Sequence, residues 1–242
     1  PLLAPLIPTI RDMLREYEIA SGGRIEAEVV EKPKTPEERI AFRETHLTAY
    51  QGKRLARRYR KLVDPIADPR LKEAVAKGYH KLLSYKDEYE VARLHLQTEA
   101  KAREAFDGDF KLKYHLAPPL LPGKDAARRP KKRTFGPWIG RLYPILARLR
   151  RLRGTPLDLF GYSAERRMER GLIKQYEADM AEFLPRAAPE TMDALVALAE
   201  LPLSIRGFGP VKEKNVEKAG KQRRDLIAHL RAGGAPMAEA AE

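Results

Sequence analysis

The stretch TPEERIAFRETHLTAYQGKRLARRYRKLV, residues 35–63, sets the fold class of this 242-residue chain. Thr35 is suited to cap a helix, Pro36 suits the first turn, and Glu38 stands where a capping box places its acid. Apolar residues then recur at steps of three to five, the spacing of one helix face: Leu47, Tyr50, Leu55, Tyr59 and Leu62. We therefore predict one amphipathic helix over residues 36–63.

The same helical period returns along most of the chain. Asp68-Pro69 repeats the cap-and-proline start and predicts a helix to about residue 105, with a break near Gly78 or Ser84. Further helices are predicted over residues 137–151, 163–184, 189–200 and about 211–230. The predicted fold class is mainly α, a single helical domain with long connecting loops.

Two short segments change to a period of two. Apolar and polar residues alternate over residues 24–29 and again over residues 110–116, the pattern of half-buried strands. These two segments allow a small two-stranded β ribbon. The stretch between them and the next helix, residues 117–137, holds five prolines and is predicted to be irregular.

The chain divides by composition into three parts. We predict that residues 1–35 are a linker or the end of a preceding domain, that residues 36–230 form the helical domain, and that residues 231–242 form a flexible tail. The opening PLLAPLIPTI lacks a basic n-region and a small-residue cleavage site. We therefore expect the chain to be a segment of a longer polypeptide.

Composition excludes several kinds of site and of protein. The chain holds 47 Lys and Arg against 34 Asp and Glu, a net charge of +13 that favours anionic partners. It holds no cysteine, which excludes disulfides, thiol nucleophiles and iron–sulfur ligation within the segment and fits a cytoplasmic protein. No apolar run reaches the roughly 20 residues of a membrane span, so we expect no membrane partner.

Most of the excess charge lies in residues 124–153, with eleven Lys or Arg and one Asp. Clustered arginines can bind phosphate or carboxylate groups and speed encounter with an anionic partner. The alternative to a binding surface is a solvated loop followed by a helix with one solvent-exposed, charged face. The candidate anion- or partner-binding residues are Lys124, Arg128, Arg129, Lys131, Lys132, Arg133, Arg148, Arg150, Arg151 and Arg153.

Catalytic and metal-binding patterns are not recognisable in the sequence. The five histidines form no HxH or HExxH pair, so we predict no metal site. In SYKDEYE, residues 84–90, neighbouring carboxylates such as Asp87 and Glu88 could share a proton. Because adjacent helical residues point to different faces, solvated charges or local ion pairs are favoured there. We predict no catalytic residue.

Six ordered blocks resemble one family. They are LTAYQ (47–51), KLLSYKDEYEVARL (81–94), YHLAPPLL (114–121), FGPW (135–138), LRGTPLDLFGYSAERRMER (152–170) and LPLSIRGFGPVKE (201–213). Together they resemble the C-terminal helical domain of fused indolepyruvate (2-oxoacid) ferredoxin oxidoreductases, over roughly residues 40–215. The chain departs from that pattern at Ile139, Leu159 and Pro210, where Met, Pro and His are expected.

The resemblance implies a parent enzyme that oxidatively decarboxylates arylpyruvates to acyl-CoA. Such enzymes use thiamine diphosphate, magnesium, 4Fe-4S clusters and CoA, and they pass electrons to ferredoxin. We expect no cofactor in this segment. For the motif loops a structural role is favoured, with aromatic rings fixing turns and arginines bonding loop carbonyls; these residues are Tyr114, His115, Phe135, Trp138, Tyr162, Arg166, Arg167 and Arg206.

These observations lead to one main hypothesis and two alternatives. The main hypothesis is a non-catalytic accessory domain that supports assembly with the catalytic domains of its parent chain, in a homo-oligomer, and docks ferredoxin or CoA through its basic surface. The alternatives are a basic nucleic-acid-binding module and a scaffold. The scarcity of stacking aromatics among the basic residues disfavours nucleic acid.

Overall fold

The computed structural model of the chain describes residues 33–105, 113–116, 133–207 and 209–233. By their contacts, the described residues 33–98, 113–116, 133–207 and 209–233 belong to one unit. The helical elements, where η marks a 3₁₀ helix, are α2 (Pro36–Tyr50), α3 (Lys53–Val63), α4 (Pro69–Leu83), α5 (Glu88–Ala105), η1 (Pro137–Leu142), α6 (Tyr143–Leu149), η2 (Arg150–Leu152), α7 (Ala164–Phe183), η3 (Leu184–Arg186), η4 (Pro189–Thr191), α8 (Met192–Glu200), η5 (Leu201–Ser204) and α9 (Pro210–Arg231). The strands are β1 (Tyr114–Leu116) and β2 (Arg133–Phe135). The mainly helical fold class is thus confirmed.

The predicted helix starts are confirmed in their hydrogen bonds. The Thr35 hydroxyl accepts from the Glu38 amide at 3.2 Å, and the Glu38 carboxylate accepts from the Thr35 amide at 3.2 Å. This reciprocal pair is the predicted capping box. At the start of α4, the Asp68 carboxylate accepts from the Leu71 amide at 2.8 Å.

The single helix predicted over residues 36–63 is wrong, because it is two helices. Its break lies at Gln51 and Gly52, and Gly52 has a φ of 136°, a backbone conformation that L side chains rarely adopt. Between α4 and α5 the predicted break at Ser84 is confirmed, whereas α4 runs unbroken through Gly78.

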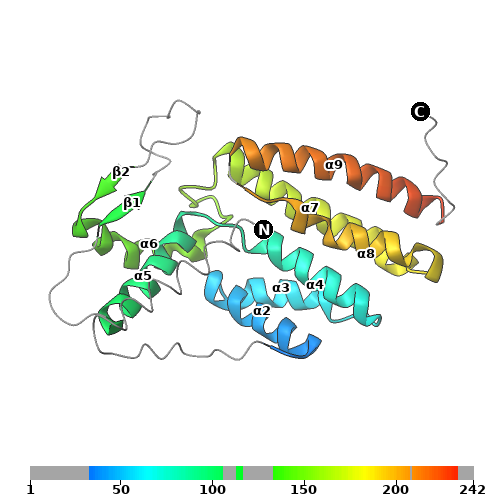
Figure 1. The fold of residues 1–242 in the computed structure, drawn as a ribbon, viewed down its shortest axis with the longest axis horizontal. Coiled ribbons are helices and arrows are strands. Elements are labelled where there is room, and N and C mark those ends of the chain that lie inside the picture. Colours follow the sequence, from blue (N-terminus) through cyan, green and yellow to red (C-terminus); the bar gives the residue numbers. More distant parts are fainter. Residues whose placement is uncertain (1–32, 106–112, 117–132, 208, 234–242) are drawn as a thin grey trace, which may run out of the picture. The chain divides into compact units, whose positions relative to one another are not determined.

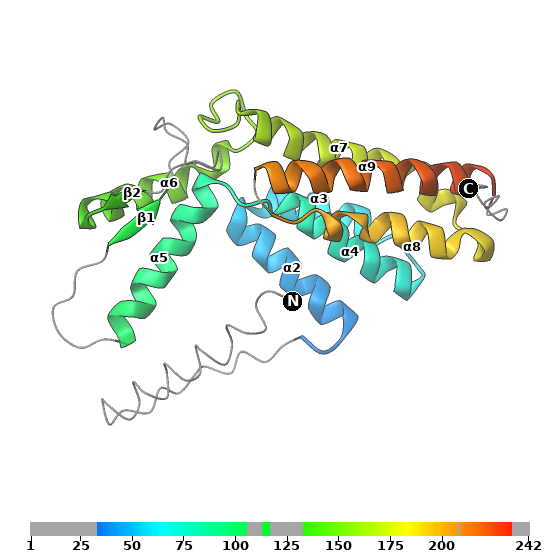
Figure 2. The same ribbon diagram turned by 45° about the horizontal axis from the view of Figure 1, so that its top comes forward.

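The larger core lies around α4, which packs against α2, α3, α7 and α8 (Figures 1 and 2). Gly78 allows a close approach there, because a Cβ at this position would lie 2.0 Å from the carbonyl oxygen of Ala199. Tyr176 lies at the same place, and its hydroxyl donates to the carbonyl oxygen of Ala199 at 3.0 Å. The glycine therefore serves packing between helices rather than a break in α4.

A second, smaller core lies between α5, the ribbon and α6. It contains Ala92, Tyr114 and Tyr143, all buried. The ribbon pairs β1 antiparallel with β2, placing Tyr114 opposite Phe135. The predicted strand over residues 24–29 lies outside the described residues. The second strand instead comes from the end of the stretch predicted to be irregular, where no proline interrupts residues 131–136 and the backbone amides can pair.

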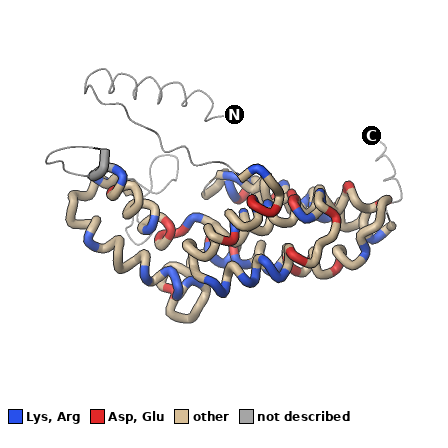
Figure 3. Tube along the Cα trace, turned by 90° about the horizontal axis from the view of Figure 1, so that it is seen from below, with Lys and Arg blue, Asp and Glu red and all other residues tan. Residues whose placement is uncertain are grey.

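Lys and Arg are spread over most of the described helices rather than confined to one of them (Figure 3). Within the described ranges, no helix combines the length and the apolar character needed to cross a membrane.

Candidate functional site

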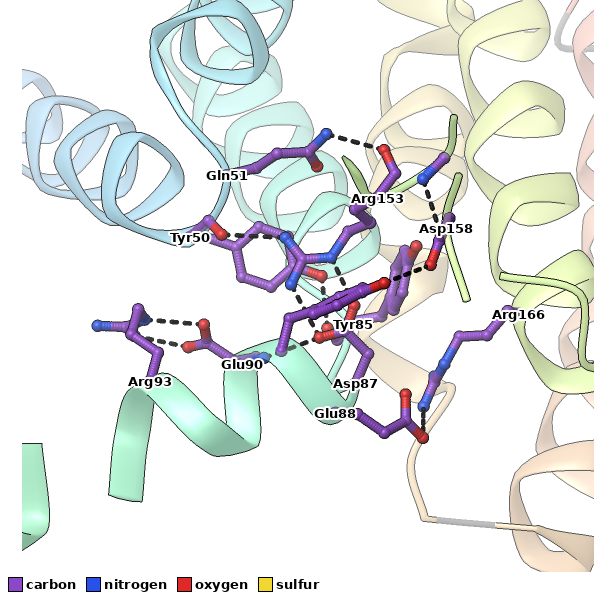
Figure 4. Close-up of polar contacts among 12 residues, drawn as sticks. Tyr50, Gln51, Tyr85, Asp87, Glu88, Glu90, Arg93, Arg153, Asp158 and Arg166 are labelled. Carbon is purple, nitrogen blue, oxygen red and sulfur yellow. Dashed lines mark hydrogen bonds and ion pairs between the residues drawn. The ribbon is translucent and has the colours of Figure 1, made fainter. Parts of the chain in front are cut away.

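Buried polar side chains gather where three segments meet (Figure 4). The segments are the end of α2, the α4–α5 connection and the loop that follows η2. We call this group the junction network; its members are Tyr50, Gln51, Tyr85, Asp87, Tyr89, Arg153 and Asp158. All three segments lie in blocks of the sequence that carry the family resemblance.

The centre of the junction network is the ion pair of Arg153 with Asp87. Both side chains are almost fully buried, at 3% and 2% exposure. The guanidinium donates to both carboxylate oxygens, Nη2 to Oδ1 at 2.8 Å, and Nη1 donates to the carbonyl oxygen of Tyr50 at 3.0 Å. Burial opposes the charged form of Arg153, but the hydrogen bonds and charge of Asp87 prevail and raise its pKa.

Asp87 has a second role at the start of α5. Its Oδ1 accepts from the Glu90 amide at 2.9 Å, the bond of an N-capping residue. The same carboxylate therefore starts a helix and neutralises an arginine from a segment 66 residues away. This arrangement ties the direction of α5 to the position of the loop after η2.

Tyr50 packs against the guanidinium and hydrogen-bonds to Tyr85. The Cζ of Arg153 lies 3.7 Å from the ring centroid of Tyr50, a cation–π contact. The Tyr50 hydroxyl donates to the carbonyl oxygen of Tyr85 at 2.7 Å. Burial raises the pKa of Tyr50 well above its ordinary value and that of Tyr85 to about 12. Both phenols therefore stay protonated at neutral pH.

Asp158 organises the loop after η2 from inside. Its Oδ1 accepts from the Tyr89 hydroxyl at 3.0 Å and its Oδ2 accepts from the Gly154 amide at 2.7 Å. Gly154 has a φ of 77°, and a Cβ on Gly161 would lie 2.5 Å from Oδ2. Both glycines are thus required by the loop that encloses this carboxylate.

The three neighbouring acids of SYKDEYE each have a different arginine partner. Glu90 forms a bidentate pair with Arg93 at 2.8 and 2.6 Å. Glu88 lies 3.6 Å from Arg166, and burial raises the pKa of Glu88 despite that charge. The predicted local ion pair is confirmed for Glu90, whereas solvation of Asp87 is wrong. Separate partners indicate structural ion pairs rather than a proton shared between carboxylates.

The structure separates the candidate anion-binding residues. Arg148 and Arg151 are exposed, as is Arg133 on β2, and Arg150 donates to the carbonyl oxygen of Ala147 at 2.7 Å. Arg153 does not belong to a docking surface, because the chain buries it against Asp87. The other candidates lie outside the described residues: Lys124, Arg128, Arg129, Lys131 and Lys132.

The predicted bond from an arginine to a loop carbonyl is confirmed at one of three positions. Arg167 donates to the carbonyl oxygen of Tyr162 at 2.8 Å. Arg206 donates to that of Leu203, at 3.1 Å, but Leu203 lies in η5. Arg166 is buried beside Glu88 and Tyr85.

The aromatic residues of the motif loops differ in burial. Tyr114 is buried in the smaller core and Phe135 packs partly against it, as the structural interpretation requires. Trp138 and Tyr162 are 56% and 63% exposed, so they do not fix turns to a core. Tyr162 instead closes its loop from outside, donating to the carbonyl oxygen of Pro156 at 2.6 Å. His115 lies in β1.

Sequence reasoning missed a pair of histidines on α2 and α4. The Nδ1 of His46 lies 3.0 Å from the Nε2 of His80, hydrogen-bonding distance for two neutral rings. Burial, with the nearby charges of His46 and Arg43, lowers the pKa of His80 to about 3. Within the described residues, no group of three or more His, Asp or Glu side chains is placed to hold a metal ion.

The junction network was also missed, although one signal pointed to it. Asp87 stands directly before a helical run with Glu90 three residues later, the pattern of an N-cap. Its partner Arg153 could not be found this way, because it looks like any other arginine of the basic stretch. Only the three-dimensional structure brings the two together.

Comparison with known proteins identifies one family. No curated protein matches the chain, and no solved structure matches it. A family of unknown function, DUF6537, matches residues 36–225, which span all the described helices except the end of α9. The chain therefore belongs to the DUF6537 family.

Proposed function

We propose that this chain is a non-catalytic accessory domain of a 2-oxoacid ferredoxin oxidoreductase that converts arylpyruvates to acyl-CoA. The observation that carries the proposal is the convergence of the resembling blocks. Gln51, Asp87 and Arg153 come from three different blocks, and both Gln51 and Asp87 hydrogen-bond to Arg153 in the junction network. Side chains engaged in this way position helices and are not available to a substrate.

The proposed role is support and recruitment. The helical domain assembles with the catalytic domains of the parent chain in a homo-oligomer. Thiamine diphosphate, magnesium, the 4Fe-4S clusters and the CoA site would belong to those domains. The basic segment would attract acidic ferredoxin or the phosphates of CoA, since clustered positive charge increases the rate of encounter with an anionic partner.

The test uses the full-length protein in two assays, CoA-dependent reduction of ferredoxin and of a viologen dye by indolepyruvate. Exchange of Arg128, Arg129, Lys131, Lys132 and Arg133 for Glu should slow ferredoxin reduction at low salt and leave dye reduction unchanged. The matched control is Lys218→Glu with Lys221→Glu on the exposed side of α9. Absence of 2-oxoacid oxidation would refute the parentage, and unchanged ferredoxin kinetics would refute the docking role.

The net charge of +13 also favours a second candidate, a nucleic-acid-binding module. A gel shift with single- and double-stranded probes separates the two. Binding that weakens steeply between about 50 and about 200 mM salt is expected of nucleic-acid recognition. No shift at the lower salt concentration would exclude this candidate.

A further inference from the structure

The loop between η2 and α7, residues 154–162, exposes large apolar side chains. Leu157 and Leu159 are 69% and 70% exposed. The preceding segment adds three more, Trp138, Leu142 and Ile145, at 56%, 43% and 55% exposure. Single exposed leucines are common on protein surfaces. Five large exposed apolar groups within 22 residues of chain make this part of the protein our candidate for a contact surface.

The segment η1–α6 also has apolar side chains on its inner side. Tyr143 and Ala147 are buried, and Ile139 and Leu146 pack against the smaller core. A surface helix normally exposes polar residues on the side away from the core, whereas a helix that is apolar on both sides is usually covered. The outward Leu142 and Ile145 are therefore suited to contact with another molecule.

The backbone of the loop is held in one conformation by many hydrogen bonds. Asp158 accepts from Tyr89 and from the Gly154 amide. From outside, the Tyr162 hydroxyl donates to the carbonyl oxygen of Pro156 at 2.6 Å, and Arg170 donates to that of Gly161 at 2.6 Å. The two leucines are thus displayed from a fixed frame, which reduces the entropy lost when a partner binds.

The chain before the loop carries positive charge only. The described residues 133–157 contain six Arg and no Asp or Glu. Arg148 and Arg151 before the loop and Arg167 after it are exposed, whereas Asp158 is buried and Glu165 is half-buried. Apolar anchors with arginines, and with few acidic groups, have the composition of protein–protein interface centres. Charge complementarity then requires acidic groups around the contact on the partner.

We infer that the loop of residues 154–162 is a preformed docking element for a partner protein whose surface combines an apolar recess with an acidic rim. A lipid surface accepts apolar side chains in any geometry, so a rigid loop would add little to membrane binding. A recess of defined shape binds a rigid loop more tightly than a flexible one, because less entropy is lost. The inference rests on the proposed function and deepens it, because it assigns the recruiting role to described residues and states the chemistry of the partner.

The experiment places a photoreactive benzoylphenylalanine at position 159 of the full-length protein in its native cells. The control carries the same group at position 42, where Phe42 is 57% exposed on α2. Irradiation followed by mass spectrometry identifies the cross-linked molecule and the attached peptide. We expect one dominant partner protein, cross-linked from position 159 and not from position 42. The cross-linked peptide of that partner should contain an excess of Asp and Glu.

Binding of the identified partner, once purified, completes the test. Leu157→Ala with Leu159→Ala should raise the Kd at least about tenfold, because two large apolar side chains that the partner buries are removed, and Phe42→Ala should leave it unchanged. Cross-links to lipid, to nucleic acid or to a protein segment without acidic excess would overturn the inference, as would equal yields from positions 159 and 42. Because the cross-link does not depend on 2-oxoacid oxidation, a failure of the docking inference can be told apart from a failure of the proposed function.

Discussion

The larger helical core and the junction network are both buried, yet different interactions hold them. Around α4 the contacts are apolar, and residues such as Leu195 and Val75 need only the right volume and face. In the junction network a charged pair, Arg153 and Asp87, lies at the centre, and each group has a specific partner. Apolar contacts contribute stability without much direction, whereas a buried ion pair is costly unless its geometry is right. The junction therefore contributes chiefly by positioning the loop of residues 154–162.

The largest effect should come from removing one partner of the central pair. Arg153→Met leaves the Asp87 carboxylate buried without its counter-charge, which costs about 3–5 kcal/mol of unfolding free energy. Urea unfolding followed by circular dichroism measures the loss. The neighbouring exposed Arg151→Met should change stability by less than about 0.5 kcal/mol; equal effects of the two variants would contradict the assignment.

The larger core should respond to volume rather than charge. Gly78→Ala brings a methyl group against the Ala199 carbonyl, and overpacking of this kind costs about 1–3 kcal/mol. That exceeds the gain of about 1 kcal/mol in helix propensity. Gly171→Ala in α7 is the control, because no atom lies within 4 Å of its added Cβ and only the gain remains. A stabilised Gly78→Ala variant would show that the helices are not closely packed there.

The histidine pair between α2 and α4 should make the stability of the fold sensitive to acid. Because the pKa of folded His80 is about 3 and the unfolded value is about 6.5, the unfolded chain binds the extra proton between these values. Stability is therefore fully present above about pH 6.5 and falls below it, by up to about 2 kcal/mol at pH 5. The free energy of unfolding, measured at about pH 6.5 and at about pH 5, should change less for His80→Gln than for the wild type. The same pH dependence in the wild type and the variant would reject the explanation.

A smaller effect should appear at the loop. Tyr89→Phe removes one hydrogen bond to Asp158, a loss of about 1 kcal/mol. Hydrogen exchange over residues 153–163 should become faster, while exchange in α4 keeps its wild-type rate. Unaltered protection of the loop would mean that Asp158 does not hold it.

Helix positions were predictable because their signals are local. Thr35 with Glu38 and Asp68 with Pro69 sit within a few residues of the amides that they satisfy. The break at Gly52 was missed because the apolar spacing continues across it. Where α4 passes Gly78, the sequence suggested a break, and only the neighbouring Ala199 carbonyl explains the glycine.

The junction network was not predictable, for a physical reason. Arg153 is buried because it pairs with Asp87, a residue distant in the sequence. The pattern of charges along the chain does not indicate that pair. The strand Arg133–Phe135 was missed for a similar reason, since it forms only by pairing with Tyr114–Leu116. Local patterns predicted the elements, and tertiary contacts determined how the polar residues are used.

A double-mutant cycle on Arg153 and Asp87 tests the central claim most directly. The free energies of unfolding of wild type, Arg153→Met, Asp87→Leu and the double variant yield the coupling between the two side chains. Our account predicts a coupling of at least about 2 kcal/mol, because each single variant leaves a buried charge and the double variant leaves none. A coupling close to zero would show that the pair is not buried together and would contradict the account.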